Sequence, residues 1–457
     1  MKKFKYFLLS LSMAAGLFFA ALATPAAAEE NWPTAPEVSA ESAIIMEADS
    51  GAILYEKNIH EQRYPASITK IMTTLLALEK CPLSDNVHFS KDAVYNVEGT
   101  QVGITPDEEV PLDECLYGVM LASGNEIADA VAEHVGGTYD NFVAMMNKRA
   151  SSLGCLNTHF NNPHGLPDEN HYTSAYDMAL IAKAAYAIDS FKTISGTRYH
   201  IIPPTNLYGE ERAMANHHKM ITNSIYHYDY CTGGKTGYTN AARYNLVTFA
   251  EKDGMKLICV IMKDQELAAQ YNDSAALLDY AFQNFKKIQL TTNDLGVNLK
   301  GSGLFPIENS AFTENSADIS ISNNAYVVLP NNLELANLSR TINYSGSQQG
   351  KLGSINYLYG QHFLGDIPIT YTNNTKATSK KTAVPADNSN KFFKINLRTI
   401  LFVIIGICAA ILIVALAAKF IYNHHFVKPL TFEQRKRRAW RKKHRSSFKI
   451  KLPRRRK

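Results

Sequence analysis

One stretch of this 457-residue chain restricts its possible folds more than any other: Thr399–Ala418 contains twenty residues and no charged side chain. At 1.5 Å per residue, a helix of that length is about 30 Å long, which matches the hydrocarbon core of a bilayer. A helix that is apolar on every side is either buried in a large core or spans a membrane. We therefore predict a transmembrane helix over residues 397–421.

The basic residues are concentrated after this segment. Residues 428–457 contain 15 Lys and Arg and a single acidic residue, Glu433. Because the cytoplasmic flanks of membrane helices carry an excess of Lys and Arg, the tail over residues 422–457 is predicted to lie in the cytoplasm. The topology alone accounts for the tail, although such tails also contact anionic lipid or nucleic acid.

The rest of the chain is acidic. Without the tail and the three lysines among the first five residues, it has 29 basic and 41 acidic residues, a formal charge of −12. An acidic body is not expected to bind nucleic acid, so the sequence pI of 8.6 misleads.

The N-terminus has the three parts of a secretory signal. The lysines precede an apolar run from Tyr6 to about Leu22, and small residues follow as far as Ala28. Residues 1–28 are predicted to be a cleaved signal peptide, and an uncleaved membrane anchor is the alternative. The chain from residue 29 to about 396 is then exported.

Cysteine and histidine do not indicate a metal site. Five of the six cysteines precede the apolar segment, which allows at most two disulfides, and no C-x-x-C spacing occurs. The adjacent pairs His217-His218 and His424-His425 are poorly spaced for one metal, and H-E-x-x-H is absent. We expect no metal and no cofactor. The six cysteines are Cys81, Cys115, Cys155, Cys231, Cys259 and Cys408.

Periodicity in the exported part predicts strands at both ends and helices between them. Strands are expected in a hairpin over residues 42–56 and in a second hairpin over 244–250 and 255–262. This arrangement indicates one α+β domain over about 35–286, an antiparallel sheet covered by helices. Helices are expected over residues 65–80, 111–122, 126–135, 139–153, 174–187 and 273–286.

The following residues change character. Short strand-like pieces separated by turn residues predict a small β domain over residues 287–372. Residues 373–396 are polar and poor in apolar side chains, which is typical of a linker. The expected strands cover residues 319–321, 325–329, 335–342 and 355–358.

Three short motifs indicate the chemistry: Ser67-Ile-Thr-Lys70, Ser123-Gly-Asn125 and Lys235-Thr-Gly237. S-x-x-K, S-D-N and K-T-G together are the signature of class A β-lactamases and penicillin-binding proteins. A literal Ser84-Asp-Asn86 also occurs, but it follows the helix that starts near Ser67 and is predicted to lie about 20 Å away. Ser123 falls at a break between two helices, where a loop can present side chains to a cleft, so we assign it to the middle motif.

The first motif provides a nucleophile and its base. Three residues apart at a helix start, Ser67 and Lys70 share one face, and the free Ser67 N–H can donate to an oxyanion. A serine hydroxyl needs a base, and a lysine becomes one only when its pKa falls from about 10.4 toward about 7–8. Burial and a second cation, Lys235, are both expected to lower the pKa of Lys70.

The other motifs are expected to bind and orient the substrate. Ser123 can relay a proton to the leaving amine, and Asn125 can hold the substrate amide. Lys235 and Thr236 can bind a terminal carboxylate, on an edge strand that can pair with an extended peptide. Gly237 allows close approach of the backbone, and the Tyr238 N–H is the second candidate oxyanion donor.

With these motifs and their order, the sequence resembles the D-alanyl-D-alanine carboxypeptidases, low-molecular-mass penicillin-binding proteins of the serine peptidase type. Residues 162–166 (NPHGL), 172–178 (YTSAYDM) and 244–247 (YNLV) add to the resemblance, which covers about 35–286. It implies a β-lactamase/transpeptidase-like fold, with Ser67 as acyl-ester nucleophile, Lys70 as proton acceptor, Ser123 as catalytic and Lys235 as a substrate contact. It also implies peptidoglycan stem peptides ending in D-Ala-D-Ala as substrate, β-lactams as covalent inhibitors, and a role in wall synthesis and cell shape.

The chain departs from the family pattern in places. Arg243 occupies a position where a glycine is expected before Tyr244, and a full membrane span replaces the amphipathic anchor that is common in the family. The middle motif contains Gly124 where many relatives have Asp, although the glycine form is common among these carboxypeptidases.

Several alternatives remain open. A β-lactamase would need a deacylating carboxylate, for which Glu169 is the nearest offering but in unsuitable surroundings. A catalytically silent β-lactam sensor or wall-binding scaffold is a second alternative, against which the intact set of Ser and Lys residues argues. Endopeptidase or transpeptidase activity is a third.

Overall fold

The computed structural model describes residues 31–290, 317–321, 325–343 and 351–373. All of them belong to one compact unit, Met1–Lys376. The predicted signal peptide, linker, membrane helix and basic tail lie outside the described residues and stay predictions.

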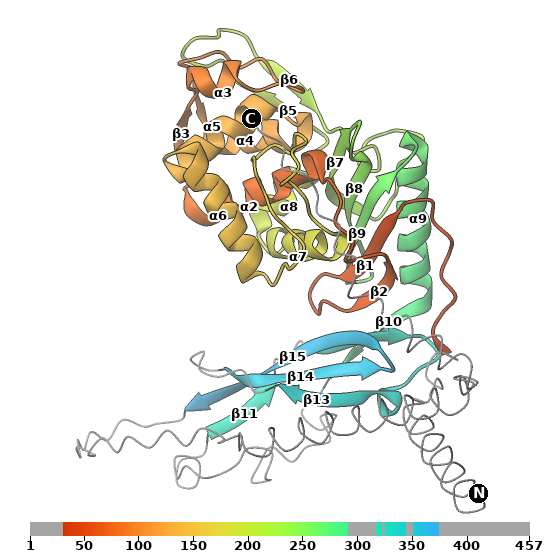
Figure 1. The fold of residues 1–457 in the computed structure, drawn as a ribbon. Helices are drawn as coiled ribbons and strands as arrows, with labels where there is room; N and C mark the ends of the chain where they lie inside the picture. The colour runs from red at the N-terminus through yellow and green to blue at the C-terminus, as the bar shows by residue number, and fades with distance from the viewer. Residues whose placement is uncertain (1–30, 291–316, 322–324, 344–350, 374–457) are drawn as a thin grey trace, which may run out of the picture. The chain divides into compact units, whose positions relative to one another are not determined.

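A five-stranded antiparallel sheet forms the centre of this unit (Figure 1). Its order, β2-β1-β9-β8-β7, brings the N-terminal hairpin beside strands that come 200 residues later, as the sequence predicts for one sheet with strands from both ends. β7 is an edge strand. The bounds are β1 Ser42–Glu47, β2 Ile53–Lys57, β7 Cys231–Thr239, β8 Arg243–Lys252 and β9 Met255–Asp264.

Both faces of this sheet are buried, and alternate residues of each strand supply two separate cores. In β9, Ile258 and Val260 face the larger core, whereas Leu257 and Cys259 face the smaller one. Side chains of successive strand residues point to opposite faces, so a strand covered on both sides is apolar throughout. That is why residues 255–262 contain one continuous apolar run.

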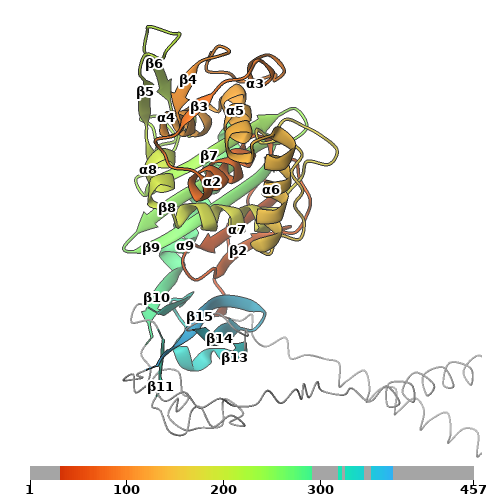
Figure 2. The same ribbon diagram turned by 90° about the vertical axis from the view of Figure 1, so that its left-hand side faces the viewer.

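Most helices cover one face and a single long helix covers the other (Figures 1 and 2). The buried central helix, α2, packs against α5 and α7, while α9 covers the opposite face. The covering helices are α2 Lys70–Lys80, α4 Leu112–Tyr117, α5 Asn125–Gly136, α6 Tyr139–Ser152, α7 Ala175–Tyr186, α8 Asp189–Gly196 and α9 Leu267–Asn284.

Local sequence signals account for several helix ends. Ser174 caps α7 by accepting the N–H of Asp177, and Gly137 ends α5 with a φ of 72°. The expected helix over 111–122 changes to a π-helical turn, Gly118–Ala122, before Ser123. The helix expected over 273–286 starts earlier, at Leu267, and its first turn has neither an acidic residue nor a side-chain cap to mark the start in the sequence.

Smaller elements at the rim were not expected from the sequence. Two short antiparallel pairs and one short helix pack against the helical layer. Pairs this short leave little periodic signal. They are β3 Asn86–His88, α3 Lys91–Tyr95, β4 Glu109–Pro111, β5 Tyr199–Ile202 and β6 Arg212–Ala215.

A β-rich region follows α9, as the sequence predicts. Its four-stranded sheet has the order β11-β15-β14-β13, and β10 pairs with β12. Leu335–Asn337 is a 3₁₀ turn instead of part of a strand, and the long strand β15 was not expected. The bounds are β10 Phe285–Gln289, β11 Ala317–Ile321, β12 Tyr326–Pro330, β13 Ser339–Asn343, β14 Lys351–Tyr359 and β15 His362–Asn373.

Two further observations concern the predicted anchor and cysteines. Within the described ranges, every helix is too short or too polar to cross a bilayer, and Thr399–Ala418 falls outside those ranges. The five described cysteines are all free thiols. Burial raises the pKa of Cys115 and Cys259, which keeps these thiols protonated.

Candidate active site

Ser67 and Lys70 lie where one turn of 3₁₀ helix, η2 (Ala66–Thr69), passes into α2. The Nζ atom of Lys70 is 3.3 Å from Ser67 Oγ. Ser67 is partly exposed, whereas Lys70 is completely buried. A substrate can therefore reach the hydroxyl while the amine beside it is shielded from water.

The Lys70 amine has two other partners. Nζ donates to Oδ1 of Asn125 at 2.7 Å and to the backbone oxygen of His164 at 2.8 Å. A neutral amine has two hydrogens and one lone pair. With both hydrogens directed at these oxygens, the lone pair faces Ser67 Oγ, which is the orientation that a general base requires.

Burial and a neighbouring cation lower the pKa of Lys70 well below its ordinary value, and Lys235 is that cation. Asp129 and Glu126 act in the opposite direction. Burial removes water from the ammonium form, and a like charge adds repulsion, so both favour the neutral amine. The sequence predicts this lowering of the Lys70 pKa and its two causes, burial and Lys235, and the structure agrees.

Ser123 is presented by unusual backbone. The π-helical turn ends at Ser123, which adopts left-handed torsion angles, φ 64° and ψ 31°. Left-handed backbone costs about 1–2 kcal/mol for a residue with a Cβ and tends to persist at functional sites. The Ser123 side chain is buried, and no hydrogen bond joins its hydroxyl to another described residue.

Asn125 has a role that the sequence did not suggest. Besides accepting from Lys70, its side chain donates to the backbone oxygen of Glu98 at 2.6 Å. The next residue, Glu126, accepts the N–H groups of Val102 and Gly103. Asn125 thus orients the base and fastens a neighbouring loop. Its predicted contact with the substrate amide stays a prediction.

The third motif lies on β7, the predicted edge strand, directly beside Ser67. A Cβ atom on Gly237 would lie 2.9 Å from the Pro65 oxygen and 3.0 Å from the Ser67 nitrogen. Contacts of about 3.0 Å and below are too short for a side chain between two backbones, so glycine permits the approach. This contact brings the strand that carries Tyr238 alongside the Ser67 N–H.

Lys235 is buried in the same strand. Its Nζ donates to the backbone oxygen of Thr236 at 3.1 Å, and burial lowers the pKa of Lys235 to about 7. An anion that binds here would restore the charged form. Thr236 is partly exposed and Tyr238 is exposed, so both remain accessible beside the cleft.

Two residues outside the three motifs hold the turn that carries Ser67 in place. Asn245 of β8 donates to the backbone oxygens of Tyr64 and Pro65, at 2.8 Å each. Gly165 lies so close to Ala66 that a Cβ there would overlap the Ala66 oxygen. Ala66 is held at φ 50° between them. Asn245 and Gly165 belong to segments that contribute to the family resemblance, and contacts with backbone leave no other pattern in a sequence.

A buried carboxyl group lies behind the base. Asp129 Oδ1 is 3.6 Å from His164 Nε2, and it has no hydrogen-bond partner among the described residues. Because His164 Nδ1 accepts the Leu166 N–H, its proton belongs on Nε2 and points toward Asp129. Burial raises the pKa of Asp129 to about 8, although Lys70 opposes this. Four residues after Asn125 on α5, Asp129 was not recognised from the sequence.

Three residues considered in the sequence analysis, Ser84, Glu169 and Arg243, lie in the described part of the structure. Ser84 is exposed after the far end of α2, while the chosen motif supplies Asn125 to Lys70. Glu169 is exposed and lines a 280 Å³ cavity with Tyr64. Arg243 adopts the glycine-like φ of 57°, yet the β7–β8 hairpin forms, with Thr239 opposite Arg243.

These contacts place a partly exposed serine hydroxyl beside a buried lysine amine, an arrangement that suits a serine-type hydrolase. The model of the D-alanyl-D-alanine carboxypeptidase family, Peptidase_S11, matches residues 29–266. That is more than half of the chain, and the chain belongs to this family of serine-type carboxypeptidases.

Curated relatives agree. The chain is 36% identical over 278 residues to D-alanyl-D-alanine carboxypeptidase DacF of Bacillus subtilis, covering 59% of this chain and 70% of the relative. It is 32% identical over 302 residues to DacC of Escherichia coli, covering 62% and 72%.

Solved structures share the fold. A D-alanyl-D-alanine carboxypeptidase of Mycobacterium tuberculosis is 29% identical with a TM-score of 0.52, covering 56% of this chain and 95% of that one. The Streptomyces K15 DD-transpeptidase is 27% identical with a TM-score of 0.52, covering 55% and 100%. DacD of Francisella tularensis, 24% identical with a TM-score of 0.55, covers 78% and 97% and shows likeness of fold alone.

Proposed function

We propose that this protein removes the terminal D-alanine from peptidoglycan stem peptides through an acyl-enzyme on Ser67. The observation that carries the proposal is the position of Lys70, whose amine faces Ser67 Oγ with both other directions occupied. Membership of the carboxypeptidase family supplies the substrate class.

The proposed reaction uses Lys70 as a neutral base. Ser67 Oγ attacks the carbonyl carbon of the penultimate D-Ala while its proton passes to Lys70 Nζ. The N–H groups of Ser67 and Tyr238 stabilise the oxyanion. Ser123 relays the proton to the leaving amine, D-Ala departs, and water then hydrolyses the ester with Lys70 again accepting a proton.

Recognition of the C-terminus is assigned to the third motif. The terminal carboxylate would bind Lys235 and Thr236, and this charge would raise the pKa of Lys235 above its value of about 7 in the free enzyme. An extended peptide can pair with the free edge of β7. β-Lactams, which present a carboxylate beside a reactive amide, are proposed to acylate the same serine.

The experiment is a D-Ala release assay on the full chain in detergent, with a pentapeptide ending in D-Ala-D-Ala. Free D-Ala from the wild type and none from Ser67→Ala supports the proposal. Release that requires an added acceptor amine would instead indicate a transpeptidase, and turnover of penicillin without D-Ala release would indicate a β-lactamase. A penicilloyl adduct on any residue other than Ser67 contradicts the assigned nucleophile.

The location is also a proposal. Residues from about 29 to 396 are proposed to lie outside the cell membrane, anchored by the span over 397–421 with the basic tail inside, in a protein of wall synthesis and cell shape. The support is the sequence pattern of an N-terminal signal and an apolar span with a basic flank. Protease added to intact cells should digest the catalytic part and spare an epitope on the tail.

A further inference from the structure

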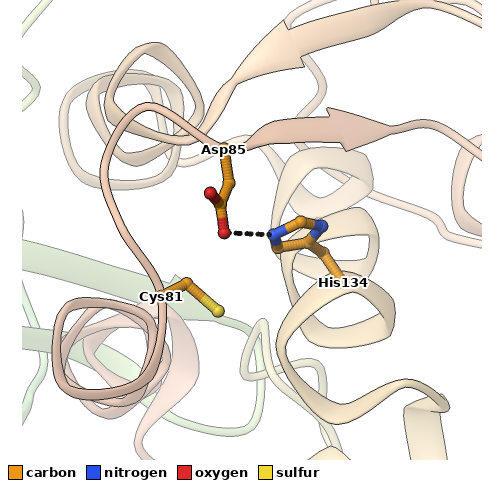
Figure 3. Close-up of side chains that lie close together, drawn as sticks. All are labelled: Cys81, Asp85 and His134. Atoms are coloured by element: carbon orange, nitrogen blue, oxygen red, sulfur yellow. Dashed lines mark ion pairs between the residues drawn. The ribbon is translucent and has the colours of Figure 1, made fainter.

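A second group of reactive side chains lies at the far end of the helix pair that carries the catalytic residues. Cys81 directly follows α2, Asp85 lies in the next turn, and His134 is in the last turn of α5. One ligand atom from each lies within 4.8 Å of the others. The three side chains point toward one another (Figure 3).

We propose that Cys81, Asp85 and His134 form a zinc site that ties the C-terminal ends of α2 and α5 together. Thiolate sulfur, imidazole nitrogen and carboxylate oxygen are the donors that Zn²⁺ takes in proteins. This inference is independent of the proposed carboxypeptidase reaction.

The distances suit a tetrahedral ion. Bonds of about 2.0–2.3 Å at tetrahedral angles separate neighbouring ligand atoms by about 3.3–3.6 Å. Asp85 Oδ2 and His134 Nε2 are 3.5 Å apart. The largest separation in the group, up to 4.8 Å, requires the side chains to close by about 1 Å.

Backbone hydrogen bonds hold the ligand-bearing turn. The Asp85 N–H donates to Pro82 O at 3.1 Å, and the Asp85 oxygen accepts the Leu112 N–H at 2.8 Å. The Cys81 N–H donates to Ala77 O at 3.0 Å. Cys81 and Asp85 are therefore fixed relative to each other before any ligand binds, which reduces the entropy cost of binding.

Access and charge also suit a cation. The side chains of His134 and Asp85 are 23% and 36% exposed, so an ion can enter and a water can complete the coordination. Among the described residues, the ion-pair partner of Asp85 is His134, and no Lys or Arg occupies the carboxylate. Binding would displace the thiol proton of Cys81.

The test uses the full chain in detergent, freed of metal with a chelator that is then removed, and kept reduced. Cobalt(II), which takes zinc sites and reports thiolate ligation by a charge-transfer band, is added first, and Zn²⁺ then displaces it. We expect one ion per chain, a rise in Tm of roughly 5 °C at 100 times Kd, and no effect of Mg²⁺.

Matched variants separate this site from adventitious binding. Cys81→Ser should abolish the charge-transfer band, and His134→Gln should weaken zinc binding at least tenfold. Two controls should bind as the wild type does: Cys231→Ser, another partly buried thiol, and His88→Gln, whose exposed ring pairs with Asp107 at 3.8 Å.

A wild type without the cobalt–thiolate band, or a band that persists in Cys81→Ser, overturns the proposal. Equal losses in the two control variants do so as well. Circular dichroism of each metal-free variant checks that it has folded, and His134→Gln keeps the test decisive if Cys81→Ser does not fold.

Discussion

Helices α2 and α5 meet at both of their ends, and the two meeting points differ in their access to water. At the N-terminal ends, Lys70 is fully buried and donates to Asn125. At the C-terminal ends, Asp85 and His134 are partly exposed beside Cys81. Burial penalises charge, which favours the neutral amine of Lys70, whereas access to water leaves the other meeting point open to a cation.

The largest effect is expected from a substitution at the buried N-terminal ends of α2 and α5, where Ser67 lies. Ser67→Ala should lower kcat/KM for D-Ala release by roughly 10⁴-fold or more, because among the described residues Ser67 supplies the one side-chain hydroxyl within hydrogen-bond distance of Lys70 Nζ. Penicillin labelling should disappear with it. A covalent adduct that survives in this variant would move the nucleophile elsewhere.

The S-x-N sequences that start at Ser84 and Ser123 lie at opposite ends of the helix pair. Ser123→Ala should slow acylation roughly 10²-fold, the usual cost of losing a proton-transfer partner, whereas Ser84→Ala should change it less than twofold. Single-turnover acylation by a chromogenic penicillin measures both. Similar losses of acylation rate in Ser84→Ala and Ser123→Ala would show that Ser123 is not the proton-transfer partner.

Lys235→Gln should raise KM roughly 10- to 100-fold, the scale of a charge-assisted hydrogen bond, and amidation of the substrate should harm this variant much less than the wild type. The pH profile of kcat/KM should change in this variant at its alkaline limb and at its acidic limb. The wild type should lose activity above about pH 7, where free Lys235 loses its proton, and the variant should lack this limb.

The acidic limb should move in the same variant. Lys70 must be neutral to accept a proton, so activity rises with pH through the pKa of Lys70. Without the repulsion of Lys235, this pKa rises, and the acidic limb shifts to higher pH. If the acidic limb and the preference for a free carboxylate are both unchanged in Lys235→Gln, Lys235 has no role in binding the carboxylate or in lowering the pKa of Lys70.

Asp129→Asn should leave the acidic limb almost in place. Burial raises the pKa of Asp129 to about 8, so below that pH the carboxyl is neutral, as the amide is, and exerts no charge on Lys70. KM should change little, because Asp129 lies behind Lys70, next to His164. A shift of the acidic limb to lower pH in this variant would show that the Asp129 carboxylate is ionised beside Lys70.

The smallest effect is expected from a substitution in the β7–β8 turn, which lies outside the α2–α5 helix pair. Arg243→Gly should relieve left-handed strain but lose the bond from Arg243 to the Gln265 oxygen, so the free energy of unfolding should change by less than about 1 kcal/mol. Denaturant titration measures this change. A loss above about 2 kcal/mol would mean that the arginine contact, and not the backbone, controls the turn.

Much of the fold follows from local pattern. Ser174 and Asp177 mark the start of α7, and the glycines at 136 and 137 mark the end of α5. Strand β15 was missed because Gly365 and Pro368 interrupt its apolar pattern. The strand pairs at the rim were missed because three or four residues leave too little periodicity to recognise.

The sequence by itself predicts the nucleophile and the base, and it determined the edge strand and the family, because these depend on residue type at short spacing along one element. Only the tertiary structure decided what surrounds them. The oxygen of His164, the carboxyl of Asp129 and the amide of Asn245 reach the site from distant segments. Cys81 and His134 likewise meet across 53 residues. Contacts of this kind arise from packing of the core, which no local spacing records.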